Sequence, residues 1–257
     1  MKPSTKIHRL QVGAHYDSLA EHGPYAAQAP RDRGGRKSRY IAAVFDAAIL
    51  PYLRNSAPFH RLLDFGCGTG IFAVQAQKFG DHVVGIDISF AMLRRTHQRA
   101  EECGANIGLA MSDGLRLPFA DSSFDRFVAR ESLCYVPDEH FSEVVSEFRR
   151  VMIGGSKIYV LDQASENPTW QINIHAPNLK KRSINEIIST FNRSGFVLEE
   201  AVAVRQPRFL WIYPIWLGLI PVSVIRFLAK AEVAWNRRFC RLRTRRWQNV
   251  LFVFHKS

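Results

Sequence analysis

The stretch Leu62-Leu-Asp-Phe-Gly-Cys-Gly-Thr-Gly70, followed by an apolar run that ends at Asp87, decides the fold of this chain. Its three glycines stand at every second position, which allows a tight strand-to-helix turn and lets the backbone approach a ligand closely. A carboxylate at the end of the next strand, Asp87, can accept two hydrogen bonds from a ribose diol. The stretch therefore predicts a pocket for a nucleoside-containing cofactor, and the rest of the chain has to select which one.

Strand and helix patterns alternate along the chain around this turn. Seven apolar segments are predicted as strands: residues 60–65, 83–86, 107–111, 124–129, 157–161, 196–204 and 249–255. Apolar residues with helical spacing from Tyr40, with Pro51 close behind, predict a helix before the first strand. Such alternation predicts an α/β fold, with a Rossmann-like, doubly wound and mainly parallel seven-stranded sheet in three layers. Ligands of such sheets bind at the carboxyl ends of the strands.

Local signals place the ends of the intervening helices. A helix over 71–79 leaves the glycine turn, and Ser89 is predicted to cap one that runs to about residue 103. Asp138 is predicted to cap the next helix, and the two glycines at 154 and 155 are predicted to end it. Ser183 and Glu186 form a capping box for a helix closed by Gly195.

Composition divides the chain into four segments. Residues 1–55 are predicted as an N-terminal helical or lid segment, with a loop over 17–36; 56–205 as the cofactor-binding core; 206–246 as an apolar and basic insertion; and 247–257 as the last strand. The four cysteines show neither a CxxC pair nor a disulfide framework, and no zinc-ligand spacing is present, so no metal site is predicted. Since residues 1–13 hold no apolar signal region, a cytoplasmic location is expected.

Motifs across residues 60–162 resemble those of the class I S-adenosylmethionine-dependent methyltransferases. The stretch from Asp64 to Gly70 is similar to their glycine signature, Val84-Gly-Ile-Asp-Ile-Ser89 resembles their second motif, and Ser112-Asp-Gly with Leu117-Pro-Phe resembles their third. Phe124-Asp-Arg-Phe-Val resembles the fourth strand, and Arg149-Arg-Val-Met-Ile-Gly-Gly155 the element after it. A nicotinamide dinucleotide is disfavoured, because its usual signature is Gly-x-Gly-x-x-Gly/Ala and not Gly-x-Gly-x-Gly.

The resemblance implies S-adenosylmethionine as the cofactor, S-adenosylhomocysteine as the product, and a set of contacts. Gly66 and Gly68 would lie against the methionine half, and Asp64 would position its amino group. Asp87 would bind the ribose hydroxyls, and Asp113 would accept from the adenine amine. The remaining implied cofactor residues are Tyr16, an aromatic that closes over the cofactor, Cys67, Gly70, Ile88, Ser112, Gly114 and Arg130.

Catalysis needs little beyond this pocket. Methyl transfer from a sulfonium is an in-line displacement, so the protein mainly aligns the acceptor and excludes water. A hydroxyl acceptor must also lose its proton, which favours a nearby His or carboxylate. The candidate residues are His15, His22, Glu131, Tyr135 and His175. In the related family a His often stands where Tyr135 stands here, before Val136-Pro-Asp, so the base stays open and a mechanism by proximity alone is an alternative.

The insertion carries most of the net charge of +12. From Arg205 to Ser257 the chain has 11 Lys or Arg and one acidic residue, Glu232. Residues 209–225 are 17 uncharged residues with two Trp, a Tyr and two Pro, too short and too broken for a bilayer span. Three interpretations stay open for this segment: a pocket wall over an apolar substrate, a contact with anionic lipid at the membrane interface, or a dimer interface.

The sequence therefore predicts a methyltransferase that acts on a small apolar or lipid-linked acceptor, on oxygen, and peripheral contact with the inner face of the membrane is one of the three interpretations of residues 209–225. Residues 130–135 lack the Asn/Asp-Pro-Pro-Tyr/Phe pattern of amino-methylating enzymes. Nucleic acid is therefore the less favoured partner, although the basic region keeps an RNA or protein methyltransferase as an alternative. A cofactor-binding protein without catalysis is the other alternative. The oligomeric state is not predicted.

Overall fold

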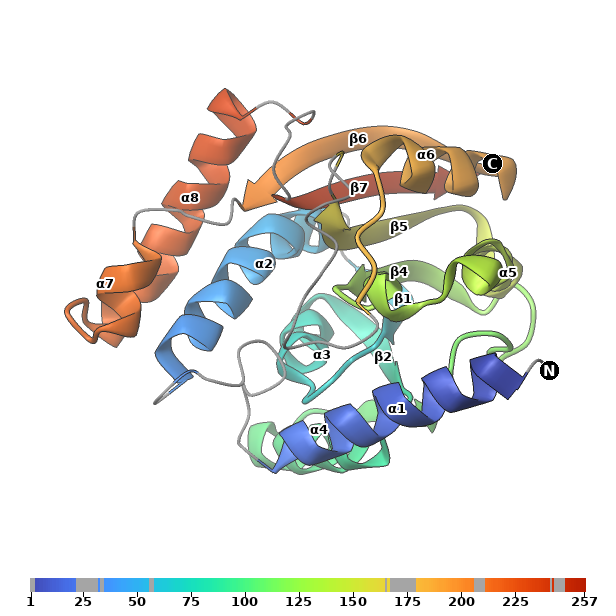
Figure 1. Cartoon of the computed structure of the whole chain (residues 1–257), viewed down its shortest axis with the longest axis horizontal. Coiled ribbons are helices and arrows are strands. Elements are labelled where there is room, and N and C mark those ends of the chain that lie inside the picture. The colour runs from blue at the N-terminus through green and yellow to red at the C-terminus, as the bar shows by residue number, and fades with distance from the viewer. Residues whose placement is uncertain are drawn as a thin grey trace.

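The computed structural model describes residues 3–21, 32, 35–55, 58–164, 166, 179–205, 211–240, 242 and 248–257, which build one seven-stranded sheet (Figure 1). The strands lie in the order β3-β2-β1-β4-β5-β7-β6. They are β1 (Phe59–Phe65), β2 (Gly80–Asp87), β3 (Ile107–Met111), β4 (Phe124–Arg130), β5 (Met152–Ala164), β6 (Phe196–Arg205) and β7 (Gln248–Lys256). Strands β1 to β5 pair in parallel, and β7 runs antiparallel to both β5 and β6. The predicted Rossmann-like sheet is confirmed.

Helices cover both faces of this sheet. They are α1 (Pro3–Ala20), α2 (Arg36–Asn55), α3 (Ile71–Ala76), α4 (Phe90–Cys103), α5 (Asp138–Val151), α6 (Ile184–Arg193), α7 (Ile212–Trp216) and α8 (Ile225–Phe239), with short 3-10 turns η2 (Gln77–Phe79), η3 (Leu133–Tyr135) and η5 (Val222–Val224). One core cluster joins the sheet to α2, α3 and α8, and the other joins it to α5 and α6. Figure 1 shows these two groups on opposite sides of the strands, as the predicted three layers require.

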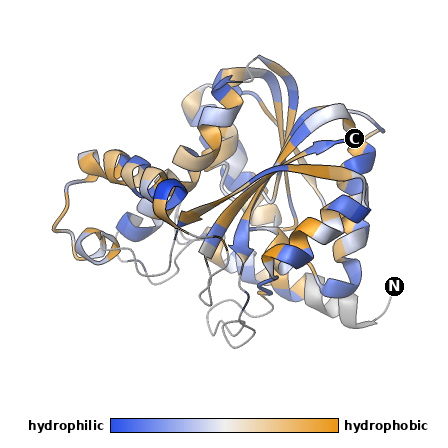
Figure 2. Cartoon of the chain, turned by 90° about the horizontal axis from the view of Figure 1, so that it is seen from above, coloured by the Kyte–Doolittle hydropathy of each residue, from blue (hydrophilic) through white to orange (hydrophobic). Residues whose placement is uncertain are grey.

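Alternation along the central strands explains why they are buried on both faces. Leu62 belongs to the α2–α3 core and its neighbour Leu63 to the α5–α6 core, since successive side chains of a strand point to opposite faces. Val128 and Phe127 of β4 divide in the same way. In Figure 2 the strands are accordingly hydrophobic along most of their length, while polar residues are concentrated on the helices.

Several predicted helix ends are confirmed. The Met92 N–H donates to the Ser89 hydroxyl at 3.1 Å, and the Glu186 N–H donates to the Ser183 hydroxyl at 3.0 Å. Both serines are N-caps of the helices that the sequence predicts. The glycine at 195 follows α6 with φ +80°.

Other local predictions are wrong. Residues 17–20 belong to α1 and not to a loop, and α2 continues through Pro51, where the flanking Ile49 and Leu53 are both fully buried. Asp138 does not cap α5, because its carboxylate pairs with Arg182 at 3.0 Å. The pair 154–155 does not stop this helix, which ends at Val151; the two glycines lie in β5, where the pairing with β4 shifts register.

The structure describes part of the insertion predicted at residues 206–246. Its bounds at 206 and 246, like the other segment boundaries, stay predictions. Within the described residues it forms α7, η5 and α8, of which α8 packs against α2 and β6. None of the described helices is both long and apolar enough to cross a membrane.

Candidate active site

The site is built where the strand order reverses, between β1 and β4. The carboxyl ends of β1, β2 and β4 are neighbours in the sheet, because β1 pairs with both of the others in parallel. Open α/β sheets leave a crevice at such a point, since the helices that follow the two strands leave toward opposite faces. The predicted residues Asp64, Asp87 and Arg130 all lie at this edge of the sheet.

The glycine turn is held close to the neighbouring strand and to the segment after β4. The N–H groups of Gly66 and Cys67 both donate to the Ile86 carbonyl oxygen at 2.9 Å. Gly66 has φ +71°, and a Cβ there would lie 2.6 Å from the Cβ of Ser132, so the turn requires glycine. Gly68 has φ +55°, yet a Cβ on it would meet nothing within 4 Å. The turn therefore presents bare backbone to open space, as a cofactor cradle needs.

Asp87 has its carboxylate fixed by backbone donors. One oxygen accepts from the Gly68 N–H and the other from the Ser89 N–H, each at 2.9 Å. Burial raises the pKa of Asp87 to about 6, although these hydrogen bonds favour the charged form. Each carboxylate oxygen keeps further lone-pair capacity. The geometry fits a ribose diol placed beside the turn and next to the predicted contact Ile88.

The Asp64 carboxylate, unlike that of Asp87, is not fully hydrogen-bonded. It lies near the end of β1 with 1% of its surface exposed, and its Oδ2 has no hydrogen-bond partner among the described residues. Burial raises its pKa to about 7, while the Arg130 guanidinium opposes the rise. A buried acceptor without a donor is costly and rare in folded proteins. An ammonium group of a ligand would supply the missing donor, so Asp64 fits the role that the resemblance implies.

The Arg130 side chain points toward the helices that flank the turn. Its Nη1 donates to Asp46 of α2 at 2.9 Å, and its guanidinium lies over the ring of Phe72 in α3, 4.3 Å from the centroid. Asp46 also accepts from Gln75 of α3. Arg130 thus ties α2 and α3 to the end of β4, while its buried Nε has no hydrogen-bond partner among the described residues. Its cofactor contact stays a prediction.

Two further predicted residues support the turn from inside. Cys67 is buried, and its Sγ lies 3.9 Å from the hydroxyl of Thr96 in α4. Burial raises the pKa of the Cys67 thiol, so it stays neutral and acts as a packing group. Gly70 begins α3 so close to Thr96 that a Cβ would come within 2.6 Å of it. The Thr96 hydroxyl in turn donates to the Gly68 carbonyl at 2.7 Å.

The segment after β3 forms a compact turn. The Ser112 N–H donates to the Asp87 carbonyl at 3.0 Å, which joins this turn to the end of β2. The Gly114 N–H donates to the Ser112 hydroxyl at 3.1 Å, and Asp113 accepts from the Leu115 N–H at 3.0 Å. Asp113 is therefore a turn residue, and its contact with adenine stays a prediction.

Helix α1 brings an aromatic residue to the site. The rings of Tyr16 and Tyr135 meet edge to face with centroids 5.4 Å apart, and burial raises the pKa of both phenols. Asp17 anchors this helix because it accepts from the Ala91 N–H at the start of α4, at 3.1 Å. His15 lies beside Tyr16 on the same helix, with ring centroids 5.4 Å apart. Tyr16 and Tyr135 thus form a neutral aromatic wall near Asp87.

Glu131 directly follows β4 in an unusual backbone conformation. Its φ is +50°, which is strained for a residue with a side chain and is often retained at functional sites. Its Oε1 accepts from Gln163 of β5 at 3.1 Å and from Asn249 of β7. Burial raises the pKa of Glu131, while the nearby Arg205 guanidinium opposes the rise. A carboxylate whose pKa is raised in this way can act as a general base.

Gln163, Asn249 and Arg205 were not predicted from the sequence. Each is a polar residue near one end of its strand, and the sequence offers no stronger signal for them. Since β7 runs antiparallel, its first residues meet the carboxyl ends of β5 and β6. Of the other candidate bases, His22 and His175 lie outside the described residues. Among the side chains described, no three His, Cys, Asp or Glu gather as a metal site.

Fold and site together define an α/β protein with a nucleoside-cofactor pocket at its switch point. Residues 62–155 match the family model described as "Methyltransferase domain". The O-methyltransferase rstn1 of Aspergillus nomiae is 32% identical over 163 residues, which are 59% of this chain and 71% of that protein. The chain belongs to the class I S-adenosylmethionine-dependent methyltransferases, as the motifs indicated.

Two further similarities extend this result. The 24-methylenesterol C-methyltransferase 2 of Oryza sativa subsp. japonica is 29% identical over 223 residues, 78% of this chain. The match spans 60% of that protein, less than two thirds of its length. The geranyl diphosphate C-methyltransferase of Streptomyces coelicolor A3(2), solved with Mg²⁺, geranyl diphosphate and S-adenosyl-L-homocysteine, has the same fold, with a TM-score of 0.68 at 18% identity. That structure covers 100% of this chain, which in turn covers 98% of it.

Proposed function

We propose that the chain transfers the methyl group of S-adenosylmethionine to a hydroxyl oxygen of a small apolar acceptor. The observation that carries the proposal is Glu131, a carboxylate of raised pKa in a strained conformation beside the glycine turn. Its neighbour Ser132 lies against Gly66, which places Glu131 one residue from the cofactor cradle. A hydroxyl needs a base when it becomes a nucleophile, and this carboxylate is suitably placed and tuned for that task.

The cofactor, when bound, supplies an activated methyl group and a neutral leaving group. Asp64 would hold its amino group and Asp87 its ribose diol, which fixes the position of the reacting carbon. Glu131 would accept the acceptor's proton, because Gln163 and Asn249 hold its Oε1 and thereby fix the orientation of the carboxylate. The neighbouring tyrosine pair would keep water from this space.

The apolar acceptor class is supported by the relatives and by the wall of the site. A sterol C-methyltransferase and an O-methyltransferase are both similar to this chain, so relatives of the chain act on carbon as well as on oxygen. Tyr16 and Tyr135 offer ring edges and faces, which suit an apolar or aromatic acceptor. The choice of oxygen rests on Glu131 alone.

The test compares matched acceptors with the full chain. A phenol-bearing isoprenoid, its analogue without the hydroxyl and its amino analogue are incubated with S-adenosylmethionine, and methylated products are identified by mass spectrometry. We expect methylation of the hydroxyl compound only, and its loss in Glu131→Gln with S-adenosylhomocysteine binding retained. Methylation of the alkene carbon or the amine would contradict the assignment to oxygen. Cofactor binding without transfer to any of the three would favour a cofactor-binding protein without catalysis.

A further inference from the structure

The segment from α7 to α8 exposes an unusual amount of apolar surface. Fifteen large apolar side chains are exposed among the described residues, and ten of them lie between residues 211 and 239. The ten are Trp211, Tyr213, Trp216, Leu217, Leu219, Val222, Val224, Phe227, Trp235 and Phe239. We call this set the α7–α8 face. A cluster of this kind on one segment marks an interaction site more often than scattered single residues do.

The opposite side of α8 is fixed to the body of the protein. Ala229 and Val233 are buried in the core, and Asn236 donates to the Val204 carbonyl at 2.9 Å. Glu232 is fully buried and accepts a hydrogen bond from Tyr40 of α2. Because this inner side is already packed, α8 cannot turn its exposed residues inward without breaking buried polar contacts. The α7–α8 face therefore stays on the outside of the described structure, where a partner can reach it.

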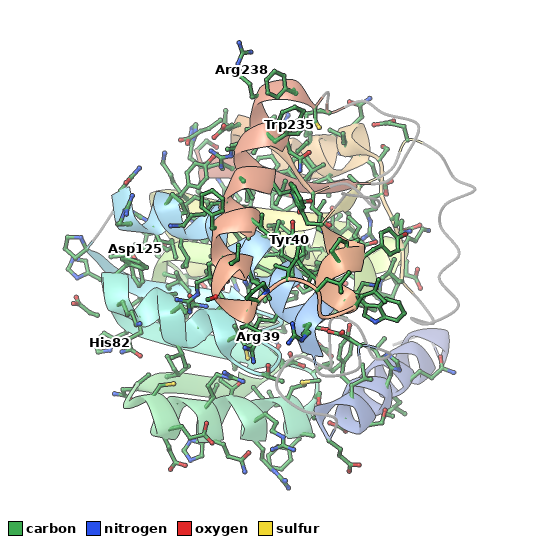
Figure 3. The ribbon with its side chains drawn as sticks, turned by 90° about the vertical axis from the view of Figure 1, so that its left-hand side faces the viewer. Arg39, Tyr40, His82, Asp125, Trp235 and Arg238 are labelled. Carbon is green, nitrogen blue, oxygen red and sulfur yellow. The ribbon has the colours of Figure 1, made fainter. Side chains whose placement is uncertain are left out.

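The exposed side of α8 has a regular pattern. Phe227, Ala231, Trp235 and Phe239 recur at every fourth position and so share one side of the helix. The rings of Trp235 and Phe239 lie 4.5 Å apart, which extends this apolar strip to the end of the helix. Figure 3 looks onto this side of the molecule, with α8 at the front carrying Trp235 and Arg238.

The exposed charges of the segment itself have a single sign. In residues 211–240 the exposed charged side chains are all cationic: Arg226, Lys230, Arg237 and Arg238. The acidic residue of this stretch, Glu232, faces inward and is fully buried. Trp and Tyr side chains favour the headgroup level of a bilayer, and Lys and Arg beside an apolar strip are attracted to anionic lipid. This combination is typical of helices that lie in a membrane interface.

We propose that the α7–α8 face docks on the surface of a membrane that contains anionic lipid. Its aromatic and aliphatic side chains enter the headgroup region, and the cations beside them contact lipid phosphates. Leu217 and Leu219, on either side of Gly218, are 63% and 73% exposed and are among the most exposed side chains of the face. The arginines at 241, 243, 245 and 246 lie outside the described residues.

The test is co-sedimentation of the full chain with vesicles of phosphatidylcholine alone or mixed with phosphatidylglycerol, at low and high salt. We expect binding to the mixed vesicles at low salt, and its loss at high salt or without the anionic lipid. The double variant Phe227→Ser/Trp235→Ser is expected to bind at least tenfold more weakly. Lys230→Gln/Arg238→Gln should lose about fivefold per charge.

Matched controls come from α4, on another side of the molecule in Figure 1. Phe90→Ser removes an aromatic side chain of similar exposure, 63%, and Arg94→Gln removes an exposed cation. Both controls should bind vesicles as the unmodified chain does. All variants are checked by thermal unfolding and by S-adenosylhomocysteine binding, which the α7–α8 substitutions should leave unchanged, so the outcome is independent of the proposed methyl transfer.

Three outcomes would overturn the proposal. One is that no vesicle binds the folded chain, or that the α7–α8 variants bind as the controls do. Another is a concentration-dependent dimer in sedimentation velocity that Phe227→Ser/Trp235→Ser dissociates while vesicles are ignored, which would assign the face to a second copy. The third is salt-sensitive binding of single-stranded RNA that Lys230→Gln/Arg238→Gln abolishes, again without vesicle binding.

Discussion

Replacement of Asp64 by Asn is expected to stabilise the protein while it weakens cofactor binding. Asp64 is 1% exposed, its Oδ2 lacks a described donor, and burial raises its pKa from 3.8 to about 7. A rise of about three pKa units corresponds to about 4 kcal/mol of unfolding free energy lost when the carboxyl ionises. Asn stays neutral, but its amide leaves a hydrogen bond unmade at a cost of about 1 to 2 kcal/mol. The expected net gain at pH 8 is about 2 to 3 kcal/mol.

The sign of the pH dependence follows from the direction of the shift. The folded pKa is raised, so the contribution of Asp64 to stability is fully present below the unfolded value of 3.8 and is lost as the pH rises through about 7. The advantage of Asp64→Asn should therefore grow between pH 4 and pH 7 and then level off. Near pH 4 the variant should be equal to the unmodified protein or slightly less stable, because both side chains are then neutral.

Cofactor binding should respond in the opposite way. The ammonium of S-adenosylhomocysteine prefers the ionised carboxylate, so the affinity of the unmodified protein should fall as the pH drops below 7, by up to tenfold per unit. Asp64→Asn removes a charge-assisted hydrogen bond of about 1.5 to 3 kcal/mol, which is roughly 10- to 150-fold in Kd. Urea unfolding and titration calorimetry at a series of pH values measure the two effects.

The matched control is Asp162→Asn. Asp162 of β5 is also buried, 3% exposed, and burial raises its pKa to about 7, but it lies two strands away from β1, near Cys134 and Arg182. Its replacement should reproduce the pH-dependent gain in stability and leave S-adenosylhomocysteine affinity unchanged. The reasoning would be refuted if Asp64→Asn changed stability equally at all pH values, or if it bound S-adenosylhomocysteine as tightly as Asp162→Asn.

Three further predictions follow from the same geometry. Gly66→Ala should lower the free energy of unfolding by about 2 to 3 kcal/mol, because the new Cβ would overlap Ser132 and the residue has a positive φ. The control Gly104→Ala, at φ +63° with open space around it, should lower it by about 1 kcal/mol in the same urea titration. Glu131→Gln should reduce kcat by a factor of about 10² to 10⁴ with little change in S-adenosylhomocysteine Kd, and an unchanged kcat would remove it as the base. Glu232→Gln should destabilise the protein by about 3 kcal/mol, because it leaves Arg205 buried without its nearest counter-charge; a loss below 1 kcal/mol in thermal unfolding would contradict this pairing.

The sequence predicted the fold and the glycine turn well because both depend on local signals. A glycine turn, a strand of apolar residues and a serine cap each act over a few residues, so Gly66, Asp87 and Ser89 could be placed before the structure was known. The same locality explains the errors. Asp138 has the pattern of a cap, but a distant cation, Arg182, binds its carboxylate.

The surroundings of the candidate base could not be predicted in this way. Gln163 reaches Glu131 because β5 pairs with β4, and Asn249 reaches it because β7 enters the sheet beside β5. This strand order is a property of the whole topology. Likewise, the partition of α8 into a buried and an exposed side depends on its contacts with α2. Periodicity could show that this segment is amphipathic, but not that its one acidic residue, Glu232, faces inward.

The position of β7 has a consequence for the order of folding. Strand β6 pairs with no described strand except β7, which also completes β5, and the α7–α8 segment separates β6 from β7 along the chain. During synthesis, β6 therefore emerges long before its partner, and the free edge of β5 stays open in the meantime. Strands β1 to β5 can form their parallel pairs before β7 has been synthesised. We expect this part to fold first, with the β6–β7 half as the slow, aggregation-sensitive step in refolding.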